Sequence, residues 1–244
     1  QGLGNVGYYT ASILQEEDGA KIVAILEWDG ALVDPKGLDV NDVFQYKCDN
    51  KGGVKGYPRA EYVEDSKSLL EMECDILIPA AMEAVINRGN AAKIKAKLIG
   101  EAANGPVTFA AETVLKEKGV VIIPDVYLNA GGVTVSYFEW IKNLSHIRFG
   151  RMNRRYEEGQ SQLLIEAIEK TGNKVPVELV EKLSQGADEI ALVRSGLDDT
   201  MRKAFQDIRE RFWSNEKIPN YRTAAMAIAI EKIHTSYRTM GIYP

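Results

Sequence analysis

Short apolar runs alternate with amphipathic stretches along the first half of the chain. The runs are rich in Val, Ile and Leu and predict buried strands, since such residues suit strands that are covered on both faces. They span residues 21–27, 75–81, 96–102 and 120–125. Apolar residues spaced three or four apart predict helices at residues 6–14, 40–50, 85–95 and 109–118. Strands and helices that alternate in this way imply a doubly wound parallel sheet.

Beyond Gly131 the apolar pattern becomes mainly helical. It predicts helices over residues 133–144, 155–171, 177–185, 197–213 and 222–240. The second of these is charged except for a stripe formed by Leu163, Leu164 and Ile168. That stripe packs either against helices of its own subunit or against a neighbouring subunit. The predicted fold class is therefore a Rossmann-type α/β domain followed by a helical C-terminal region.

A G-x-G-x-x-G motif begins at Gly2 and precedes the first predicted helix. In this motif Gly2 permits a tight turn, Gly4 lets backbone approach a diphosphate, and Gly7 allows close helix packing. The N–H groups at the start of the helix, from Asn5 and Val6 onward, favour a phosphate. Because glycine turns that bind nothing are common, the motif gains weight only from its context.

A turn of this kind normally follows a buried strand in the middle of the sheet. Gln1 stands directly before Gly2, so no strand precedes the turn in this sequence. We therefore expect the first strand of the sheet to be missing from it.

Glu27 ends the strand that follows the first helix, twenty residues after Gly7. A carboxylate at this spacing accepts hydrogen bonds from the two hydroxyls of an adenosine ribose. It would repel a 2′-phosphate by about 4 kcal/mol for charges about 4 Å apart. The sequence therefore favours NAD over NADP, although nearby lysines leave NADP possible. The alternative is that Glu27 is a solvated acid at the end of a strand.

Small and amide residues follow the other predicted strands, where ligands of doubly wound folds bind. Ala80 and Ala81 leave room for a flat ring. Asn104 and Asn129 each stand beside glycine or alanine, and an amide can both donate to and accept from a carboxamide or a ribose hydroxyl. Turn formation explains either asparagine alone, but two at successive strand ends favour a binding cleft.

The composition excludes several classes of function. A net charge of −5 gives no general attraction to nucleic acid or to anionic lipid. No apolar run is long enough to span a bilayer, and two cysteines are too few for a disulfide framework. We expect a cytoplasmic protein, or a mitochondrial matrix protein if the source is eukaryotic. His146 and His234 lack a metal-ligating neighbour, so no metal site is expected.

The segment Leu128–Trp140 resembles the signature of the glutamate dehydrogenase family. Residues 1–7, 101–106 and 222–225 resemble the same family in the same order, so the resemblance covers nearly the whole chain. One departure is Ala102, where the family usually has glycine. The extra methyl group could crowd nearby backbone, but it removes no hydrogen-bonding group.

The resemblance implies roles for individual residues. Asn104 and Asn129 are expected to hold the nicotinamide ribose and ring, while Val133 and Ser136 face the side-chain carboxylate of the substrate. Related dehydrogenases for leucine or phenylalanine carry an apolar residue where this chain has Ser136, which favours glutamate. The alternative is that Ser136 is a hydroxyl on a helix surface. The family's catalytic lysine and aspartate belong to a preceding domain, so we expect no catalytic residue in this chain.

The resemblance also implies an organisation. We expect a dinucleotide-binding domain over 1–150, an antenna-like helical arm over 151–195, and C-terminal helices over 196–244 that return to the absent substrate domain as part of a hinge. The arm predicts a homo-oligomer, by resemblance a hexamer. The expected activity is NAD-dependent oxidative deamination of L-glutamate to 2-oxoglutarate and ammonia. The alternatives are a related amino-acid dehydrogenase and a non-catalytic nucleotide-sensing module.

Overall fold

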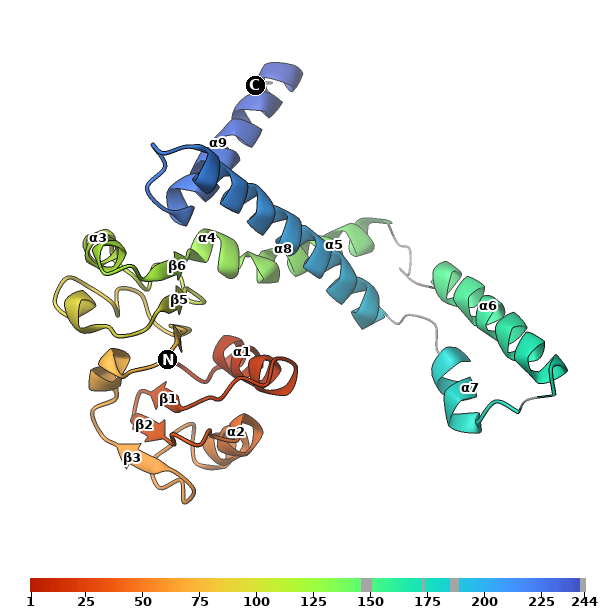
Figure 1. Cartoon of the computed structure of the whole chain (residues 1–244), viewed down its shortest axis with the longest axis horizontal. Helices are drawn as coiled ribbons and strands as arrows, with labels where there is room; N and C mark the ends of the chain where they lie inside the picture. The colour runs from red at the N-terminus through yellow and green to blue at the C-terminus, as the bar shows by residue number, and fades with distance from the viewer. Residues whose placement is uncertain (146–150, 173, 185–188, 242–244) are drawn as a thin grey trace. The chain divides into compact units, whose positions relative to one another are not determined.

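The computed structural model describes residues 1–145, 151–172, 174–184 and 189–241 (Figure 1). The chain divides into two compact units. The first consists of Gln1–Asn129 and Ile208–Pro244, and the second of Ala130–Asp207. His146 lies outside the described residues. The predicted division at residues 150 and 195 remains a prediction.

Two three-stranded sheets form the first unit. One is antiparallel, in the order β1-β2-β3, and the other is parallel, in the order β4-β5-β6. The strands are β1 (Ala24–Glu27), β2 (Gly30–Val33), β3 (Glu61–Val63), β4 (Ile76–Leu77), β5 (Leu98–Gly100) and β6 (Val121–Ile123). The predicted α/β class with a parallel sheet is confirmed. The strand predicted over 21–27 pairs differently, because a two-residue turn between Glu27 and Gly30 folds β1 back against β2.

Helices pack on these strands at positions that the apolar pattern indicates. The helices of this part are α1 (Asn5–Glu16), α2 (Val40–Asp49), α3 (Phe109–Glu117) and α4 (Asp125–Leu128), with short 3₁₀ turns η1 (Ser66–Glu71) and η2 (Ala91–Lys93). The side chains of Asp39 and Thr108 cap α2 and α3 by accepting the N–H groups of Asp42 and Ala111. The helix predicted over 85–95 is wrong, because η2 alone is helical there.

The first unit has two apolar cores. Leu3, Ile25 and Leu32 belong to the core beneath α1 and α2, which contact each other. The other core includes Ile99 and Leu115 beside the parallel sheet, together with Leu26 from β1. Backbone hydrogen bonds around the first residues connect the two sheets: the Gln1 amino group donates to the Ile78 carbonyl oxygen at 2.9 Å, and the Gly2 N–H donates to that of Leu26 at 2.7 Å.

The C-terminal part of the first unit is helical. The end of α8 (Glu189–Ser214) and α9 (Tyr221–Met240) pack through Ile208, Ile218 and Ala224. Asn220 caps α9, because its side-chain oxygen accepts the Thr223 N–H at 2.8 Å. This cap fixes the start of α9, and therefore the position of Arg222 in its first turn.

The second unit contains α5 (Ala130–Ser145), α6 (Arg151–Lys170), α7 (Val177–Ser184) and the first part of α8. The expected helical region is confirmed. Helices α6 and α7 contact each other. In the predicted stripe of α6, the side chain of Leu163 is 67% exposed and that of Leu164 is 62% exposed. The described residues of this chain therefore do not cover the stripe.

Candidate functional site

The glycine turn before α1 is closed by contacts that only glycine permits. Gly2 has a φ of +88°, and a Cβ atom there would lie 2.7 Å from the Cβ atom of Ala81. A Cβ atom on Gly7 would lie 1.8 Å from the Gly2 carbonyl oxygen. Ala80 also approaches, since its N–H donates to the Gln1 carbonyl oxygen at 2.8 Å. The structure thus brings the first and third glycines together with the two alanines after β4.

Gly4, by contrast, faces open space. No heavy atom lies within 4 Å of the position that its Cβ would occupy, so the packing of the chain does not require glycine here. Gly4 is the N-cap of α1 and provides no side-chain cap, and Val6 in the first turn is 52% exposed. The N–H groups of a first helical turn have no intrahelical acceptor. The N-terminus of α1 is therefore an uncapped, open site that fits a diphosphate.

Glu27 lies beside this turn and is held by two donors. Its Oε1 accepts hydrogen bonds from the Leu3 N–H and from Lys47 Nζ, the latter at 2.8 Å. Lys47 Nζ also donates to the Leu3 carbonyl oxygen at 2.8 Å, and the Glu27 side chain is only 8% exposed. The interpretation of Glu27 as a solvated acid is wrong for this reason. The sequence indicates that lysines lie near Glu27, but it does not single out Lys47, which lies on α2.

Asn104 and Asn129 meet at the ends of β5 and β6. The Asn129 Nδ2 atom donates to the Asn104 Oδ1 atom at 2.6 Å. The adjoining loop is held by Asp125, whose Oδ2 atom accepts the Gly105 N–H at 2.8 Å. Each amide keeps further hydrogen-bonding capacity, and both side chains are accessible, so the pair can contact a carboxamide or a ribose hydroxyl.

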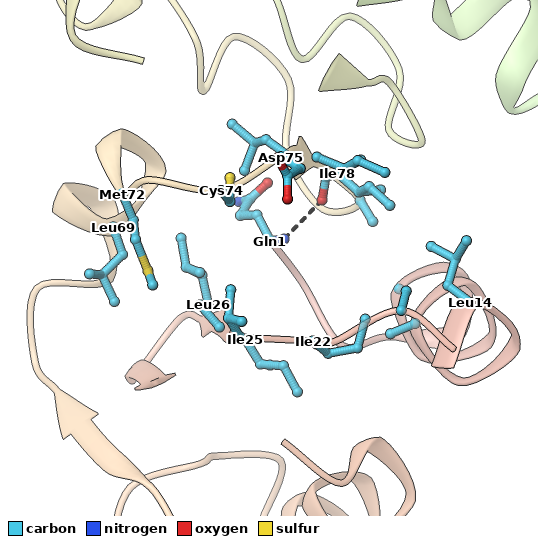
Figure 2. Close-up of a pocket in the computed structure, with 18 of the residues that line it drawn as sticks. Gln1, Leu14, Ile22, Ile25, Leu26, Leu69, Met72, Cys74, Asp75 and Ile78 are labelled. Carbon is cyan, nitrogen blue, oxygen red and sulfur yellow. Dashed lines mark hydrogen bonds between the residues drawn. The ribbon is translucent and has the colours of Figure 1, made fainter. Parts of the chain in front are cut away.

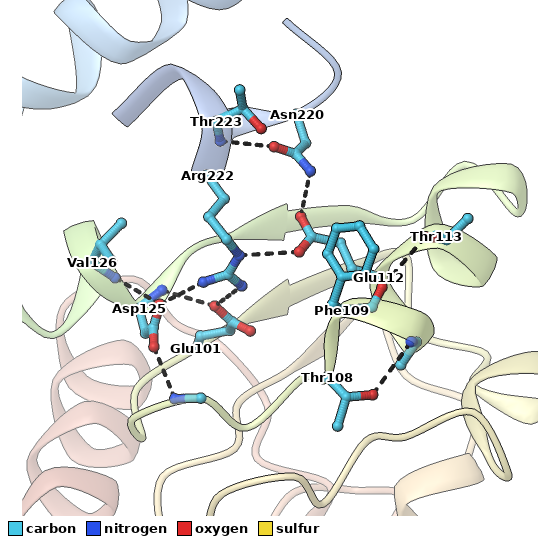
Figure 3. Close-up of polar contacts among 12 residues, drawn as sticks. Glu101, Thr108, Phe109, Glu112, Thr113, Asp125, Val126, Asn220, Arg222 and Thr223 are labelled. Atoms are coloured by element: carbon cyan, nitrogen blue, oxygen red, sulfur yellow. Dashed lines mark hydrogen bonds and ion pairs between the residues drawn. The ribbon is translucent and has the colours of Figure 1, made fainter. Parts of the chain in front are cut away.

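An ionic cluster of low exposure surrounds Arg222 (Figure 3), and Asp125 connects it to Gly105, the residue after Asn104. Arg222 bonds to Glu101 at 2.6 Å, to Asp125 at 2.6 Å and to Glu112 at 3.0 Å. Glu101 is fully buried, and the Asn220 side chain donates to the second oxygen of Glu112 at 2.7 Å. The sequence placed Arg222 and Glu101 in family-like motifs but gave no sign that they meet, because they are far apart along the chain.

The cluster changes how its members ionise. Burial raises the pKa of Glu101, and the hydrogen bonds from the Asp125 N–H and from Arg222 offset that rise only in part. Burial also raises the pKa of Asp125, but the Gly105 N–H and Arg222 outweigh it and hold that pKa below its ordinary value. The surrounding carboxylates raise the pKa of Arg222 despite its burial. Arg222 therefore stays charged, and Asp125 is ionised at neutral pH.

The two residues expected to face the substrate lie on α5, in the second compact unit. The Val133 side chain is 73% exposed, and the Ser136 hydroxyl donates to the Gly132 carbonyl oxygen at 3.1 Å. That bond lies within the helix and leaves the oxygen of Ser136 able to accept. The role of both residues toward a substrate stays a prediction.

A cavity of about 640 Å³ lies between the segments around β1 and β4 (Figure 2). Apolar side chains dominate its wall, among them Leu14, Ile25 and Met72. Gly2 and Gly7 line it but Gly4, Asn5 and Val6 do not, so the cavity adjoins the glycine turn without including the exposed start of α1. Among the described residues no cluster of three metal-ligating side chains occurs. No helix within the described ranges combines the length and apolar character needed to cross a bilayer.

Comparisons with known proteins point to one family. The family model for glutamate/leucine/phenylalanine/valine dehydrogenases matches residues 1–192. A mitochondrial glutamate dehydrogenase of Dictyostelium discoideum is 51% identical over 242 residues, which is 99% of this chain and 47% of that protein.

Solved structures give the same picture. A crystal structure of glutamate dehydrogenase from Peptoniphilus asaccharolyticus is 29% identical with a TM-score of 0.62, over 100% of this chain and 46% of that one. A hetero-hexameric glutamate dehydrogenase from Thermus thermophilus is 24% identical with a TM-score of 0.73, over 100% and 47% respectively. The chain thus spans about half the length of the relatives it matches.

Proposed function

The chain belongs to the glutamate/leucine/phenylalanine/valine dehydrogenase family, and on that premise we propose that it is the cofactor-binding part of an NAD-dependent glutamate dehydrogenase. The proposed reaction is the reversible oxidative deamination of L-glutamate to 2-oxoglutarate and ammonia. The named relatives support glutamate as the substrate. Because this chain matches only about half of each, the activity of the whole protein is inferred rather than observed.

One observation carries the proposal: the first unit gathers three matched groups at the ends of its strands. The open N-terminus of α1 suits the diphosphate. Glu27 suits the adenosine ribose, and the pair Asn104–Asn129 suits the nicotinamide ribose and ring. This is the order in which a dinucleotide presents its parts across a doubly wound fold. The residues proposed to contact the cofactor are Gly2, Gly4, Asn5, Val6, Gly7, Glu27, Ala80, Ala81, Asn104 and Asn129.

NAD is the proposed cofactor, with NADP as a weaker alternative. The Glu27 carboxylate disfavours a 2′-phosphate, while Lys47, bonded to the same oxygen, offsets part of its charge. Bound NAD supplies the hydride chemistry, and the protein supplies placement. The side chains of this chain bind and orient; the lysine and aspartate that exchange protons are proposed to lie in a substrate domain outside it.

Ser136 and Val133 are proposed to contact the side-chain carboxylate of glutamate. A hydroxyl that donates one hydrogen bond to a charged oxygen contributes about 1.5–3 kcal/mol. That is a preference of very roughly 10- to 150-fold over an apolar amino acid. The helix-internal bond of Ser136 must be exchanged for the substrate, which reduces this figure.

A homo-oligomer is proposed as the assembly, and a hexamer as its size. The exposed stripe of Leu163, Leu164 and Ile168 on α6 favours burial against a neighbouring subunit. The Thermus thermophilus structure is a hetero-hexamer, which supports the proposed number of subunits. We also propose a cytoplasmic location, or the mitochondrial matrix if the source is a eukaryote. The Dictyostelium discoideum relative, which is mitochondrial, supports the second.

The test is turnover by the full-length protein that contains this chain. With NAD and glutamate, we expect formation of NADH, with slower turnover of leucine, phenylalanine and valine. Preference for an apolar amino acid would instead identify a related dehydrogenase. NAD binding without turnover of any amino acid would support a nucleotide-sensing module. Turnover by residues 1–244 alone would overturn the placement of the proton-transfer groups outside this chain.

A further inference from the structure

The cluster around Arg222 joins four segments, and α9 is far from the other three in the sequence (Figure 3). Arg222 lies in the first turn of α9, Glu112 lies on α3, and Glu101 follows β5. Asp125 begins α4 directly after β6. One guanidinium group thus ties the C-terminal helix to the ends of the two strands that lead to Asn104 and Asn129.

Two of these contacts, those to Asp125 and Glu101, continue into the backbone near the two asparagines. The Asp125 Oδ1 atom accepts from Arg222, and its Oδ2 atom accepts the N–H of Gly105, the residue after Asn104. The Glu101 Oε2 atom accepts from Arg222 at 2.6 Å and from the Asp125 N–H at 2.8 Å. Asp125 also starts the short helix that ends just before Asn129. Arg222 therefore reaches both loops through a single intermediate residue.

The charge balance explains why Arg222 is needed for that geometry. Three carboxylates of low exposure face one guanidinium group, whose planar arrangement of donors serves all three at once. Without it, Glu101, Glu112 and Asp125 would repel one another at low exposure. Asp125 has the most room to move, since its side chain is 15% exposed while that of Glu101 is fully buried. Movement of Asp125 releases the Gly105 N–H.

We propose that Arg222 is a positioning residue for the nicotinamide half of the cofactor, acting through Asp125 on the loops that carry Asn104 and Asn129. The inference rests on the proposed function, because it assumes that these asparagines contact the nicotinamide ribose and ring. It predicts that Arg222 affects one end of the dinucleotide and not the other. The diphosphate and adenosine contacts at Gly4 and Glu27 do not involve the cluster.

The test compares two ligands in the full-length protein: NADH, which has the nicotinamide ring, and ADP-ribose, which lacks it. The variant Arg222→Lys keeps a positive charge but cannot bond to all three carboxylates. We expect it to weaken NADH binding about tenfold, which corresponds to the loss of one hydrogen bond from the displaced asparagines, while ADP-ribose affinity changes less than about twofold. The shift in fluorescence of bound NADH should also diminish. Asp125→Asn keeps only one side-chain oxygen, so it cannot accept from both the Gly105 N–H and Arg222, and it should give the same pattern.

The matched control is Arg211→Lys. Arg211 pairs with Glu231 between α8 and α9, one of its bonds being 2.6 Å, but it makes no contact with the strand ends. This variant should leave both affinities unchanged. Equal loss of NADH and ADP-ribose binding in Arg222→Lys would assign Arg222 a purely structural role and overturn the proposal, as would no loss of either. If the unaltered protein binds neither ligand, the proposed function itself fails.

Discussion

Glu27→Gln removes the charge at the end of β1 and keeps a side-chain oxygen for the Leu3 N–H. In the parent chain that N–H and Lys47 Nζ both bond to Oε1 of Glu27. The substitution therefore separates the electrostatic role of the carboxylate from its role in holding the turn. We expect the variant to fold and to discriminate less between NAD and NADP.

The magnitude follows from the charges beside the ribose site. A carboxylate about 4 Å from a 2′-phosphate opposes it by about 4 kcal/mol at an effective dielectric near 20. Lys47 lies 2.8 Å from the same carboxylate and attracts the phosphate, so the net penalty in the parent chain is smaller. Since 1.36 kcal/mol corresponds to tenfold, the NADP-to-NAD affinity ratio should rise between about tenfold and about a thousandfold. Lys47→Met should shift the ratio in the opposite direction.

The assay is a titration of the full-length protein with NADH and NADPH, followed by the fluorescence of the bound cofactor. Asp75→Asn is the control, because Asp75 also pairs with a lysine, Lys97, but is highly exposed and is not proposed to contact the cofactor. It should leave the ratio unchanged. If Glu27→Gln folds and also leaves the NADP-to-NAD affinity ratio unchanged, then Glu27 only stabilises the glycine turn and does not contact the ribose.

Three further predictions test the other parts of the site. Gly4→Ala should keep the melting temperature, because the added Cβ meets only open space, but should weaken NAD binding. Gly7→Ala should lower the melting temperature, because the added Cβ would overlap the Gly2 carbonyl oxygen. An equal effect of the two variants on the melting temperature would contradict the assignment of Gly4. Asp125 should contribute its full stability above its ordinary pKa of 3.8 and lose it as the pH falls through the lowered pKa of the folded state. The reason is that the Gly105 N–H and Arg222 favour the ionised form more strongly than burial opposes it. A melting-temperature difference between the parent and Asp125→Asn that does not shrink in this pH range would refute the prediction. Ser136→Val should reduce glutamate turnover in the full-length protein more than leucine turnover, and equal losses would leave the serine without a role in selectivity.

Periodicity and local spacing predicted those parts of the fold that depend on nearby residues. The helix after Gly4 and the parallel strands β5 and β6 lie where the apolar pattern indicates them. The spacing predicts that Glu27 lies near the glycine turn, and the structure places it there, bonded to the Leu3 N–H. The sequence predicts a binding cleft at Asn104 and Asn129; the structure shows that their side chains form a hydrogen bond, and the cleft stays a prediction.

Long-range contacts were beyond the reach of the sequence pattern. An apolar strand such as β1 can be followed either by a hairpin or by a crossover to a parallel strand. The apolar pattern alone therefore cannot show that the chain turns between Glu27 and Gly30 and pairs β1 with β2. The partners of Arg222 are separated from it by about half the chain, and nothing in local spacing marks them. The strand expected before Gly2 remains a prediction.

A structure of the full-length protein with NAD bound would show directly where the cofactor lies. We expect the diphosphate at the N-terminus of α1 beside Gly4, the adenosine ribose on Glu27, and the nicotinamide ring next to Asn104 and Asn129. A dinucleotide bound in the cavity between β1 and β4, or with its ring remote from both asparagines, would contradict it.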